Sequence, residues 1–173
     1  MKDVPVYLFL GFLESGKTKF IGETLLDKRF NQGEKTVILM CEEGLEEYDL
    51  SVFKSGNVYI ESIDGETELT SDRLAEIEKK YSPDRVMCEY NGMFLVQTLF
   101  DALPENWSVA QVFMFVNSET FISYNSNMRQ LTYDKLSMAD LIAFNRFDDK
   151  YDRDLFHKTV RAVTRRAEII RSE

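Results

Sequence analysis

The feature of this sequence that most constrains its fold is an apolar run that ends at one glycine and is followed by a second glycine five residues later. Residues 4–10 read VPVYLFL, which is typical of a buried strand, and residues 17–30 carry apolar side chains at helical spacing. Between them, residues 11–18 read GFLESGKT and satisfy the pattern G-x-x-x-x-G-K-[ST] in full. This order predicts a strand, a tight glycine-rich turn and a helix that begins at the turn.

The spacing inside residues 11–18 has a direct chemical interpretation. A loop of this kind turns its backbone N–H groups toward phosphate oxygens at the positive end of the following helix. Lys17 would reach the β- and γ-phosphates of a nucleotide, and the Thr18 hydroxyl would ligate Mg²⁺. A strand-to-helix turn that happens to contain two glycines is the simpler interpretation, but the full match in this context favours phosphate binding. The residues predicted to bind nucleotide here are Gly11, Glu14, Ser15, Gly16, Lys17, Thr18 and Lys19.

Glu14 is the unusual residue of this loop, because it places a carboxylate where an anion is expected to bind. If its side chain points outward, it could orient a partner or a water molecule. If the side chain points inward, it would weaken phosphate binding. The sequence leaves both orientations open.

A second motif, E-x-x-G, occurs where the predicted strand 85–89 ends, in the stretch CEYNG. Glu89 could hold Mg²⁺ through water, and the N–H of Gly92 could approach a γ-phosphate because glycine has no Cβ. Lys17 and Glu89 are therefore the candidate catalytic residues, and Thr18 and Glu89 are the candidate metal ligands. A glutamate beside a turn glycine is the structural alternative, but the position downstream of a phosphate loop favours function.

A third motif, NRFD, follows the apolar run at 140–145 and differs by one residue from the guanine-reading motif N-K-x-D. Asp148 could accept hydrogen bonds from N1–H and N2–H of guanine, which adenine does not offer in that arrangement. Asn145 would brace the loop, and Arg146 could stack over the base in place of the usual lysine. A polar turn after a buried strand is the alternative interpretation.

Apolar runs and helical periodicities alternate along the rest of the chain. Strands are expected at 36–41, 57–60, 85–89, 109–116, 140–145 and 167–171, and helices at 71–81, 93–102 and 152–166. This alternation implies right-handed crossovers and a mostly parallel sheet with helices on both faces. We therefore expect an α/β fold, a three-layer α/β/α P-loop NTPase domain that covers residues 1–173, with each motif at the carboxyl end of a strand.

The composition argues against several classes of function. The net charge of −9 disfavours a general binder of nucleic acid or of anionic membranes, since both attract basic surfaces. No apolar run approaches the roughly 18 residues that a membrane span requires. Two cysteines, Cys41 and Cys88, do not suggest a disulfide framework and are expected to fill core space on adjacent strands. These observations predict a cytoplasmic protein.

Together, these segments resemble the CobW-type branch of the CobW/HypB/UreG GTPases. That family's phosphate loop reads G-F-L-G-S-G-K-T, its Mg²⁺ motif is E-x-x-G, and its base motif is A-D-x-I-x-x-N-K-x-D, against ADLIAFNRFD here. Residues 41–49, CEEGLEEYD, are similar to the family's N-E-F-G segment, which responds to nucleotide. Glu42 or Glu43 would match its glutamate, and Glu42 could be a further Mg²⁺ ligand. VRAVTRRAEIIRSE looks like the family's closing helix and strand.

Two departures accompany the resemblance. The family's C-x-C-C metal motif would fall near residues 56–63, where this chain reads GNVYIESI, so a thiolate zinc site of that type is not expected. The family also usually carries a second, C-terminal domain, and this sequence ends where the nucleotide-binding domain would end.

The resemblance implies a protein that binds GTP and Mg²⁺ and hydrolyses GTP slowly, with stimulation by a partner. Hydrolysis would be coupled to metal delivery, or to metal-cofactor insertion, into a client metalloprotein, and a nucleotide-dependent dimer would be compatible with this role. Two alternatives stay open. One is a non-catalytic module that senses guanine nucleotides, which Glu14 and Arg146 would permit. The other is an ATP-dependent small-molecule kinase, against which NRFD speaks.

Overall fold

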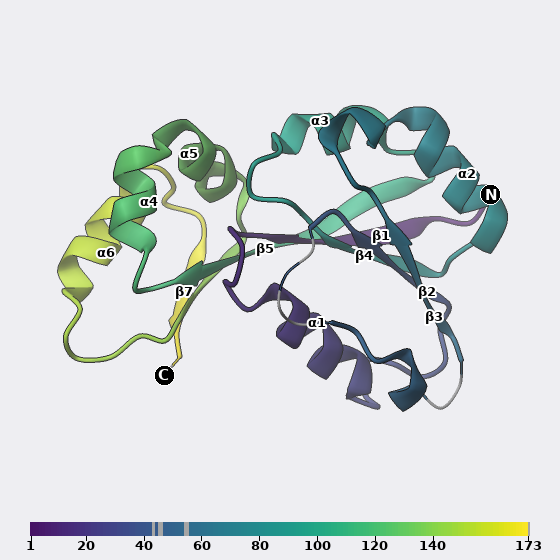
Figure 1. Ribbon diagram of the computed structural model, residues 1–173, viewed down its shortest axis with the longest axis horizontal. Helices are drawn as coiled ribbons and strands as arrows, with labels where there is room; N and C mark the ends of the chain where they lie inside the picture. Colours follow the sequence, from purple (N-terminus) through teal and green to yellow (C-terminus); the bar gives the residue numbers. More distant parts are fainter. Residues whose placement is uncertain (43, 45–46, 54–55, 173) are drawn as a thin grey trace.

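The computed structural model describes residues 1–42, 44, 47–53 and 56–172 of the 173-residue chain. Within these residues, seven strands form one parallel sheet in the order β3-β2-β4-β1-β5-β6-β7 (Figure 1). The strands are β1 (Val4–Leu10), β2 (Thr36–Met40), β3 (Val58–Ser62), β4 (Arg85–Glu89), β5 (Trp107–Asn117), β6 (Leu141–Asn145) and β7 (Glu168–Arg171). The helices are α1 (Lys17–Leu26), α2 (Ser71–Tyr81), α3 (Val96–Ala102), α4 (Phe121–Asn127), α5 (Arg129–Met138) and α6 (Arg153–Arg161).

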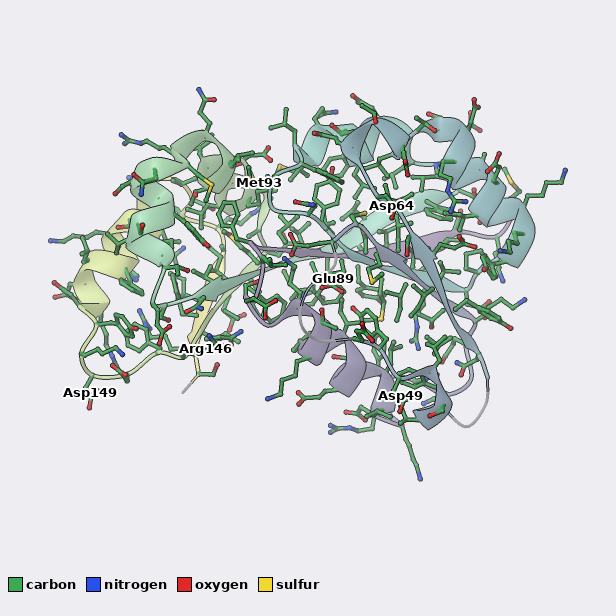
Figure 2. The ribbon with its side chains drawn as sticks, in the orientation of Figure 1. Asp49, Asp64, Glu89, Met93, Arg146 and Asp149 are labelled. Atoms are coloured by element: carbon green, nitrogen blue, oxygen red, sulfur yellow. The ribbon has the colours of Figure 1, made fainter. Side chains whose placement is uncertain are left out.

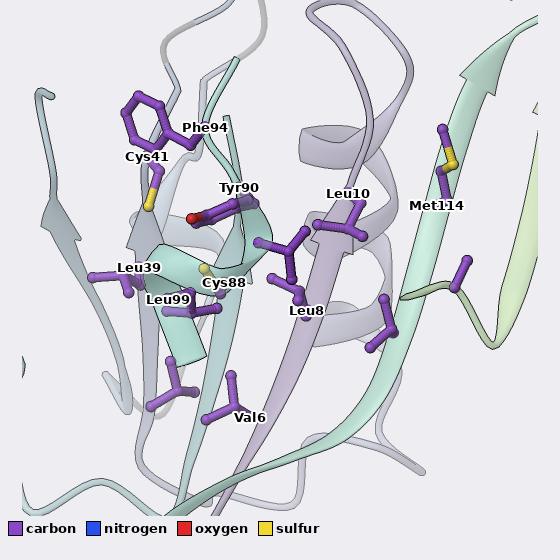
Figure 3. Packing of buried hydrophobic residues seen from close by; sticks show 14 of the residues in the cluster. Val6, Leu8, Leu10, Leu39, Cys41, Cys88, Tyr90, Phe94, Leu99 and Met114 are labelled. Atoms are coloured by element: carbon purple, nitrogen blue, oxygen red, sulfur yellow. The ribbon is translucent and has the colours of Figure 1, made fainter. Parts of the chain in front are cut away.

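Helices cover both faces of the sheet, but unequally. Side chains alternate along β1, so Phe9 packs with Ile21 and Leu25 of α1, whereas Leu8 belongs to the cluster on the opposite face. Figure 1 shows α1 on one side of the sheet and α2 and α3 on the other. The larger cluster, part of which Figure 3 shows, also includes buried residues of α4, α5 and α6, such as Phe156. The protein therefore has the predicted three layers, and each such side chain contributes about 1.5 to 3 kcal/mol on burial.

The strand register brings the candidate motifs to one edge of the sheet. Glu89, the last residue of β4, lies opposite Phe9 of β1 on one side and Met40 of β2 on the other. Asn117 and Asn145, the last residues of β5 and β6, also lie opposite each other. Because all these strands run parallel, the segments that follow them meet at the carboxyl edge of the sheet.

The structure confirms the predicted fold class and corrects some elements. The sheet is parallel throughout its described strand pairs, where the sequence predicted a mostly parallel one. Helix α1 ends at Leu26 rather than at residue 30, because Asp27 leaves the helical conformation and its carboxylate binds Arg29 in a turn. Helix α6 ends at Arg161 rather than at residue 166. The Arg161 guanidinium donates to the Ala167 carbonyl oxygen across the turn that follows the helix.

The sequence prediction missed helices α4 and α5, which lie between β5 and β6. In α5, Tyr133 is exposed, whereas Thr132 and Lys135 are buried beside Leu136. Lys135 donates to the Phe94 carbonyl oxygen, which satisfies its ammonium group in the interior. Polar residues at buried positions hide the apolar periodicity that reveals a helix in sequence. The boundaries of the other predicted elements agree within three residues. No helix in the described ranges is long and apolar enough to cross a lipid bilayer.

Candidate nucleotide-binding site

The phosphate loop, residues 11–18, connects β1 to α1 and requires glycine near both ends. Gly11 has a φ of 139° and Gly16 a φ of 103°, in the region that favours glycine. A Cβ at Gly11 would overlap the Phe115 carbonyl oxygen, and one at Gly16 would lie 2.5 Å from the Asn145 side-chain nitrogen. The loop is therefore packed closely against the ends of β5 and β6.

The loop has the features that a bound phosphate would use. Among the described residues, no side chain caps the first turn of α1, so its N–H groups are available to an anion. The Ser15 hydroxyl is buried without a hydrogen-bond partner in the described part of the chain. An oxyanion in the loop would satisfy both kinds of donor. The residues present therefore fit the phosphate group that the motif predicts.

Lys17, the first residue of α1, is buried and reaches back across the loop. Its ammonium group donates to the carbonyl oxygen of Gly11 and, at 3.1 Å, to that of Phe12. It also forms an ion pair with Glu42 at 2.7 Å, in which 2% and 10% of the two side chains are exposed. Burial lowers the pKa of Lys17, and the Glu42 carboxylate opposes this shift. The lysine is thus positioned at the loop by backbone carbonyls and one carboxylate.

The Glu42 carboxylate connects Lys17 to Gly92. One of its oxygens accepts from the Lys17 ammonium, and the other accepts from the Gly92 N–H at 3.3 Å. Gly92 in turn lies against the phosphate loop, since a Cβ there would approach the Phe12 Cα to 2.9 Å. The two groups that the sequence assigns to a γ-phosphate are therefore close together, with the Glu42 carboxylate between them.

Thr18 and Glu89 form the second part of the site. The Thr18 hydroxyl donates to one Glu89 oxygen at 2.5 Å, and the Tyr48 hydroxyl donates to the other. Burial raises the pKa of Glu89, and these two hydrogen bonds oppose the rise. A buried carboxylate beside a hydroxyl supplies the hard oxygen donors that Mg²⁺ prefers. Thr18 and Glu89 therefore fit the predicted metal ligands.

A small cavity of about 40 Å³ lies in front of the phosphate loop. Its lining combines the first two motifs with the start of the third: Leu13, Glu14, Ser15, Gly16, Lys17, Thr18, Glu42, Gly44, Glu89 and Arg146. Figure 2 shows Glu89 near the centre of the molecule and Arg146 to its left. Because Glu14 is part of this lining, this residue borders the region where the sequence predicts phosphate. The cavity has room for a few water molecules.

A larger cavity of about 440 Å³ adjoins the first and extends along α1 toward β6 and β7. The phosphate loop, Lys19, Asn117, Arg146 and Ser172 contribute to its wall. Asn145 joins its two sides, because its amide donates to the Ser15 carbonyl oxygen at 2.7 Å and accepts from the Ser172 hydroxyl at 2.8 Å. Its size and its position beside the loop suit the nucleoside part of a nucleotide.

Asp148 lies apart from this larger cavity. Its carboxylate accepts from the Lys150 N–H at 2.9 Å and pairs with the Lys150 ammonium at 3.4 Å. With Glu119 and Arg146, it lines a separate open cavity of about 520 Å³. The structure thus brings Asn145 and Arg146 to the nucleoside side of the site, while guanine reading by Asp148 stays a prediction.

Three residues of this site, Tyr48, Asn117 and Ser172, were not predicted from the sequence. Asn117 and Ser172 lie where β5 and β7 end, so the rule that ligands bind beyond strand ends could have singled them out. Tyr48 lies in the acidic stretch after β2, which has no periodicity from which a side-chain direction could be inferred. Glu43, the alternative match to the family's glutamate, lies outside the described residues.

A dedicated transition-metal site is absent from the described parts of the chain. No group of three or more His, Cys, Asp or Glu side chains there is arranged to hold a metal ion. Cys41 and Cys88 are buried free thiols, as expected, and Figure 3 shows them in the core beside Tyr90.

Comparisons with known proteins agree with this geometry. The sequence profile of the CobW/HypB/UreG nucleotide-binding domain matches residues 5–171. No curated protein sequence matches the chain. The matched range of the family profile, residues 5–171, includes all three motifs and nearly the whole sheet.

Several solved structures share the fold. The hydrogenase maturation factor HypB from Archaeoglobus fulgidus superposes with a TM-score of 0.64 at 17% identity, over 98% of this chain and 81% of that one. The Zn(II)-bound YjiA GTPase from E. coli gives a TM-score of 0.67 at 20% identity, over 98% of this chain and 57% of that one. HypB from Helicobacter pylori in complex with nickel gives a TM-score of 0.57 at 13% identity, over 98% of this chain and 78% of that one. At these identities the likeness establishes the fold alone.

Proposed function

The chain belongs to the CobW/HypB/UreG family of nucleotide-binding domains, and from this premise we propose that it binds a guanine nucleotide with Mg²⁺ and slowly hydrolyses GTP. One observation carries the proposal. Two separate segments, the phosphate loop with Lys17 and Thr18 and the second motif with Glu89 and Gly92, meet here. Thr18 contacts Glu89 directly, and the Glu42 carboxylate joins Lys17 to the Gly92 N–H. A strand-to-helix turn without function would not require this convergence.

The residues have distinct roles in this proposal. Backbone N–H groups of the phosphate loop and Lys17 would bind the β- and γ-phosphates, and Gly92 would contact the terminal phosphate. Thr18 and Glu89 would hold Mg²⁺, which supplies charge neutralisation when bound. Phosphoryl transfer to water depends on positioning and charge stabilisation more than on covalent chemistry. Among the described side chains, none stands out as orienting the attacking water, so we propose low intrinsic turnover that a partner protein raises.

The nucleoside would occupy the larger cavity. Asn145 would keep the phosphate loop and the end of β7 in place through its hydrogen bonds to Ser15 and Ser172. Arg146 would lie over the base, and Lys19 would line the ribose side. Asp148 would read guanine after its carboxylate turns away from Lys150. The Asp148–Lys150 ion pair is exposed and therefore weak, so it would not prevent this movement.

Nucleotide selectivity tests the proposal directly. With Mg²⁺ present, GTP and GDP should raise the melting temperature of the protein and ATP should not. A ligand present at about 100 times its Kd stabilises a protein by about 2.7 kcal/mol, so the shift should be large. Lys17→Ala should remove it, whereas Lys28→Ala, at an exposed position beyond α1, should keep it. Equal stabilisation by ATP would support the kinase alternative instead.

The Asp148→Asn variant extends the same measurement to the base. An amide donates where the carboxylate accepts, so affinity for GTP should fall about tenfold or more, while xanthosine triphosphate should bind better than it does to the unmodified chain. Asp149→Asn, a change at the exposed neighbouring position, should leave both affinities unaltered. If base preference is the same in all three proteins, Asp148 does not read guanine.

We further propose that hydrolysis is coupled to metal delivery, or to metal-cofactor insertion, into a client metalloprotein in the cytoplasm, with a nucleotide-dependent dimer as a compatible assembly. The support is that HypB and YjiA structures of this fold are described as a hydrogenase maturation factor, as nickel-bound and as Zn(II)-bound. This chain lacks the family's cysteine motif, so a delivered metal would need other ligands.

The second candidate is a non-catalytic module that senses guanine nucleotides. The observation in its favour is that Glu42 engages Lys17 and Gly92, the groups on which γ-phosphate chemistry depends. Turnover of GTP, measured with and without divalent metal ions, separates the two candidates. Binding without turnover under all conditions would select the sensing module.

A further inference from the structure

Glu42 makes the same two contacts that a terminal phosphate would make. Its Oε1 lies 2.7 Å from the Lys17 ammonium, and its Oε2 lies 3.3 Å from the Gly92 nitrogen. Phosphoryl groups are recognised in P-loop proteins by a lysine and by backbone N–H groups. A carboxylate is a smaller anion with the same preference for such donors. The side chain therefore satisfies the site that a γ-phosphate would otherwise occupy.

The space around this contact excludes simultaneous occupancy. The Lys17–Glu42 pair is nearly fully buried, and the cavity in front of the loop measures about 40 Å³ with Glu42 in its wall. A terminal phosphate that reaches Lys17 must take the place of the Glu42 carboxylate. When phosphate replaces the Glu42 carboxylate, Lys17 remains paired with an anion. The phosphate and the carboxylate therefore compete for the same ammonium group.

We propose that Glu42 is a specificity-determining residue, whose carboxylate occupies the terminal-phosphate position and favours a guanosine diphosphate over a triphosphate. The inference rests on the proposed guanine-nucleotide binding and goes beyond it by naming the group that distinguishes the two nucleotides. A diphosphate binds the loop through its β-phosphate and has no terminal phosphate that must replace Glu42 between Lys17 and Gly92. A triphosphate binds only when Glu42 leaves, which couples the γ-phosphate to the segment after β2.

This role differs from the Mg²⁺ ligand that the sequence suggested for Glu42. The carboxylate is turned toward the Lys17 ammonium, whose positive charge opposes a cation at the same oxygens. In the Thr18–Glu89 pair, by contrast, a hydroxyl contacts a carboxylate, and no cationic side chain among the described residues forms an ion pair with Glu89. The two acidic residues of the site therefore separate into a phosphate competitor and a metal ligand.

Titration calorimetry with GDP and with a non-hydrolysable GTP analogue, both with Mg²⁺, tests the inference on the full chain. In Glu42→Ala, affinity for the analogue should rise about tenfold, which is about 1.4 kcal/mol, while affinity for GDP stays within about twofold. Glu42→Gln retains the shape, loses the charge, and should shift the preference in the same direction. If Glu42→Ala fails to fold because Lys17 loses its hydrogen-bond acceptor, Glu42→Gln, which keeps that acceptor, carries the test.

Glu47→Ala is the matched control, because it removes one negative charge from an exposed position of the same segment. Its ratio of analogue to GDP affinity should equal that of the unmodified chain. The inference is overturned if both nucleotides bind and Glu42 variants keep the original ratio, or if they bind the analogue more weakly, as loss of a metal ligand would cause. If the unmodified chain binds neither nucleotide, the proposed function itself fails and this inference with it.

Discussion

Glu14, Arg146 and Ser82 are the non-glycine residues with positive φ in the described chain, at 61°, 55° and 43°. A residue with a Cβ pays about 1 kcal/mol or more for this conformation. Ser82 ends α2, where a left-handed residue commonly terminates a helix. Glu14 and Arg146 both line the cavities at the phosphate loop. Backbone strain is therefore concentrated at the proposed nucleotide site.

We expect Glu14→Gly to strengthen guanine-nucleotide binding several-fold. The substitution removes a carboxylate from the cavity wall, where its charge would repel phosphate, and restores a residue that tolerates a φ of 61°. The free energy of unfolding should also rise by up to about 1 kcal/mol, because the strained conformation is relieved. Nucleotide titration and urea unfolding measure the two effects separately.

Ser82→Gly is the control for strain alone. Ser82 is exposed and has a φ of 43° at the end of α2, so glycine should stabilise the chain there without changing nucleotide affinity. An equal affinity in Glu14→Gly and the unmodified chain would show that the Glu14 carboxylate does not oppose phosphate.

The sequence revealed the residues whose positions follow from motif spacing at a strand end. Lys17, Thr18 and Glu89 meet as that spacing implies, because the backbone of a parallel sheet places them. The sequence did not reveal that Glu42 would contact Lys17 and Gly92. Nor did it reveal that Asp148 would pair with Lys150. Those arrangements depend on side-chain rotamers and on the path of irregular segments, which no periodicity encodes.

At the scale of elements, a polar cluster joins the edge strand β3 to α2. The Glu61 carboxylate accepts from Arg73 at 2.8 Å, from Lys80 at 2.9 Å and from the Tyr81 hydroxyl at 2.7 Å. Partial burial alone would raise the pKa of Glu61, but hydrogen bonds from Lys80, Tyr81 and Arg73 outweigh it and lower the pKa to about 2. The ionised carboxylate therefore holds the helix against the strand.

We expect Glu61→Gln to lower the free energy of unfolding by about 1 to 2 kcal/mol at pH 7. Because the folded-state pKa lies below the ordinary value of 4.5, the stabilisation is complete above that pH and is lost as the pH falls toward 2. The difference between the variant and the unmodified chain should therefore shrink progressively between about pH 4.5 and pH 2. Urea unfolding at several pH values provides the measurement.

Glu76→Gln, also on α2, serves as the comparison. Its side chain is 73% exposed and lies 3.9 Å from Arg73, so its loss should change stability little at any pH. A pH-independent difference for Glu61→Gln would indicate that packing, and not ionisation, explains its effect.

The strands could be predicted because a parallel sheet buries both faces and produces continuous apolar runs, such as those in β2 and β4. Their order could not be predicted from the same runs. Right-handed crossovers permit several arrangements, and the choice depends on how complete faces pack together. Helix α5 escaped prediction because buried Thr132 and Lys135 interrupt its apolar pattern, and α4 because its seven residues bury only Phe121.

For the molecule as a whole, we expect zinc to bind only weakly. Cys41 and Cys88 are its only cysteines, and both are buried. A hydrogen bond with Cys41, together with burial, raises the pKa of Cys88, which disfavours the thiolate that zinc requires. Competition against a chromophoric chelator should reveal no sub-micromolar site, and a thiol reagent should react only after unfolding. One tight site in the folded chain would contradict this expectation.

The position of β1 at the centre of the sheet has a consequence for synthesis. Its neighbours in the sheet are β4 and β5. In the pairing with β5, Val4 lies opposite Trp107, so the first strand of the chain pairs with a strand that follows about 100 residues later. Contacts between such distant residues form slowly and late. On the ribosome, β1 could pair with β4 once residue 89 has emerged, but its other edge would stay unpaired and would need protection from aggregation until β5 has been translated.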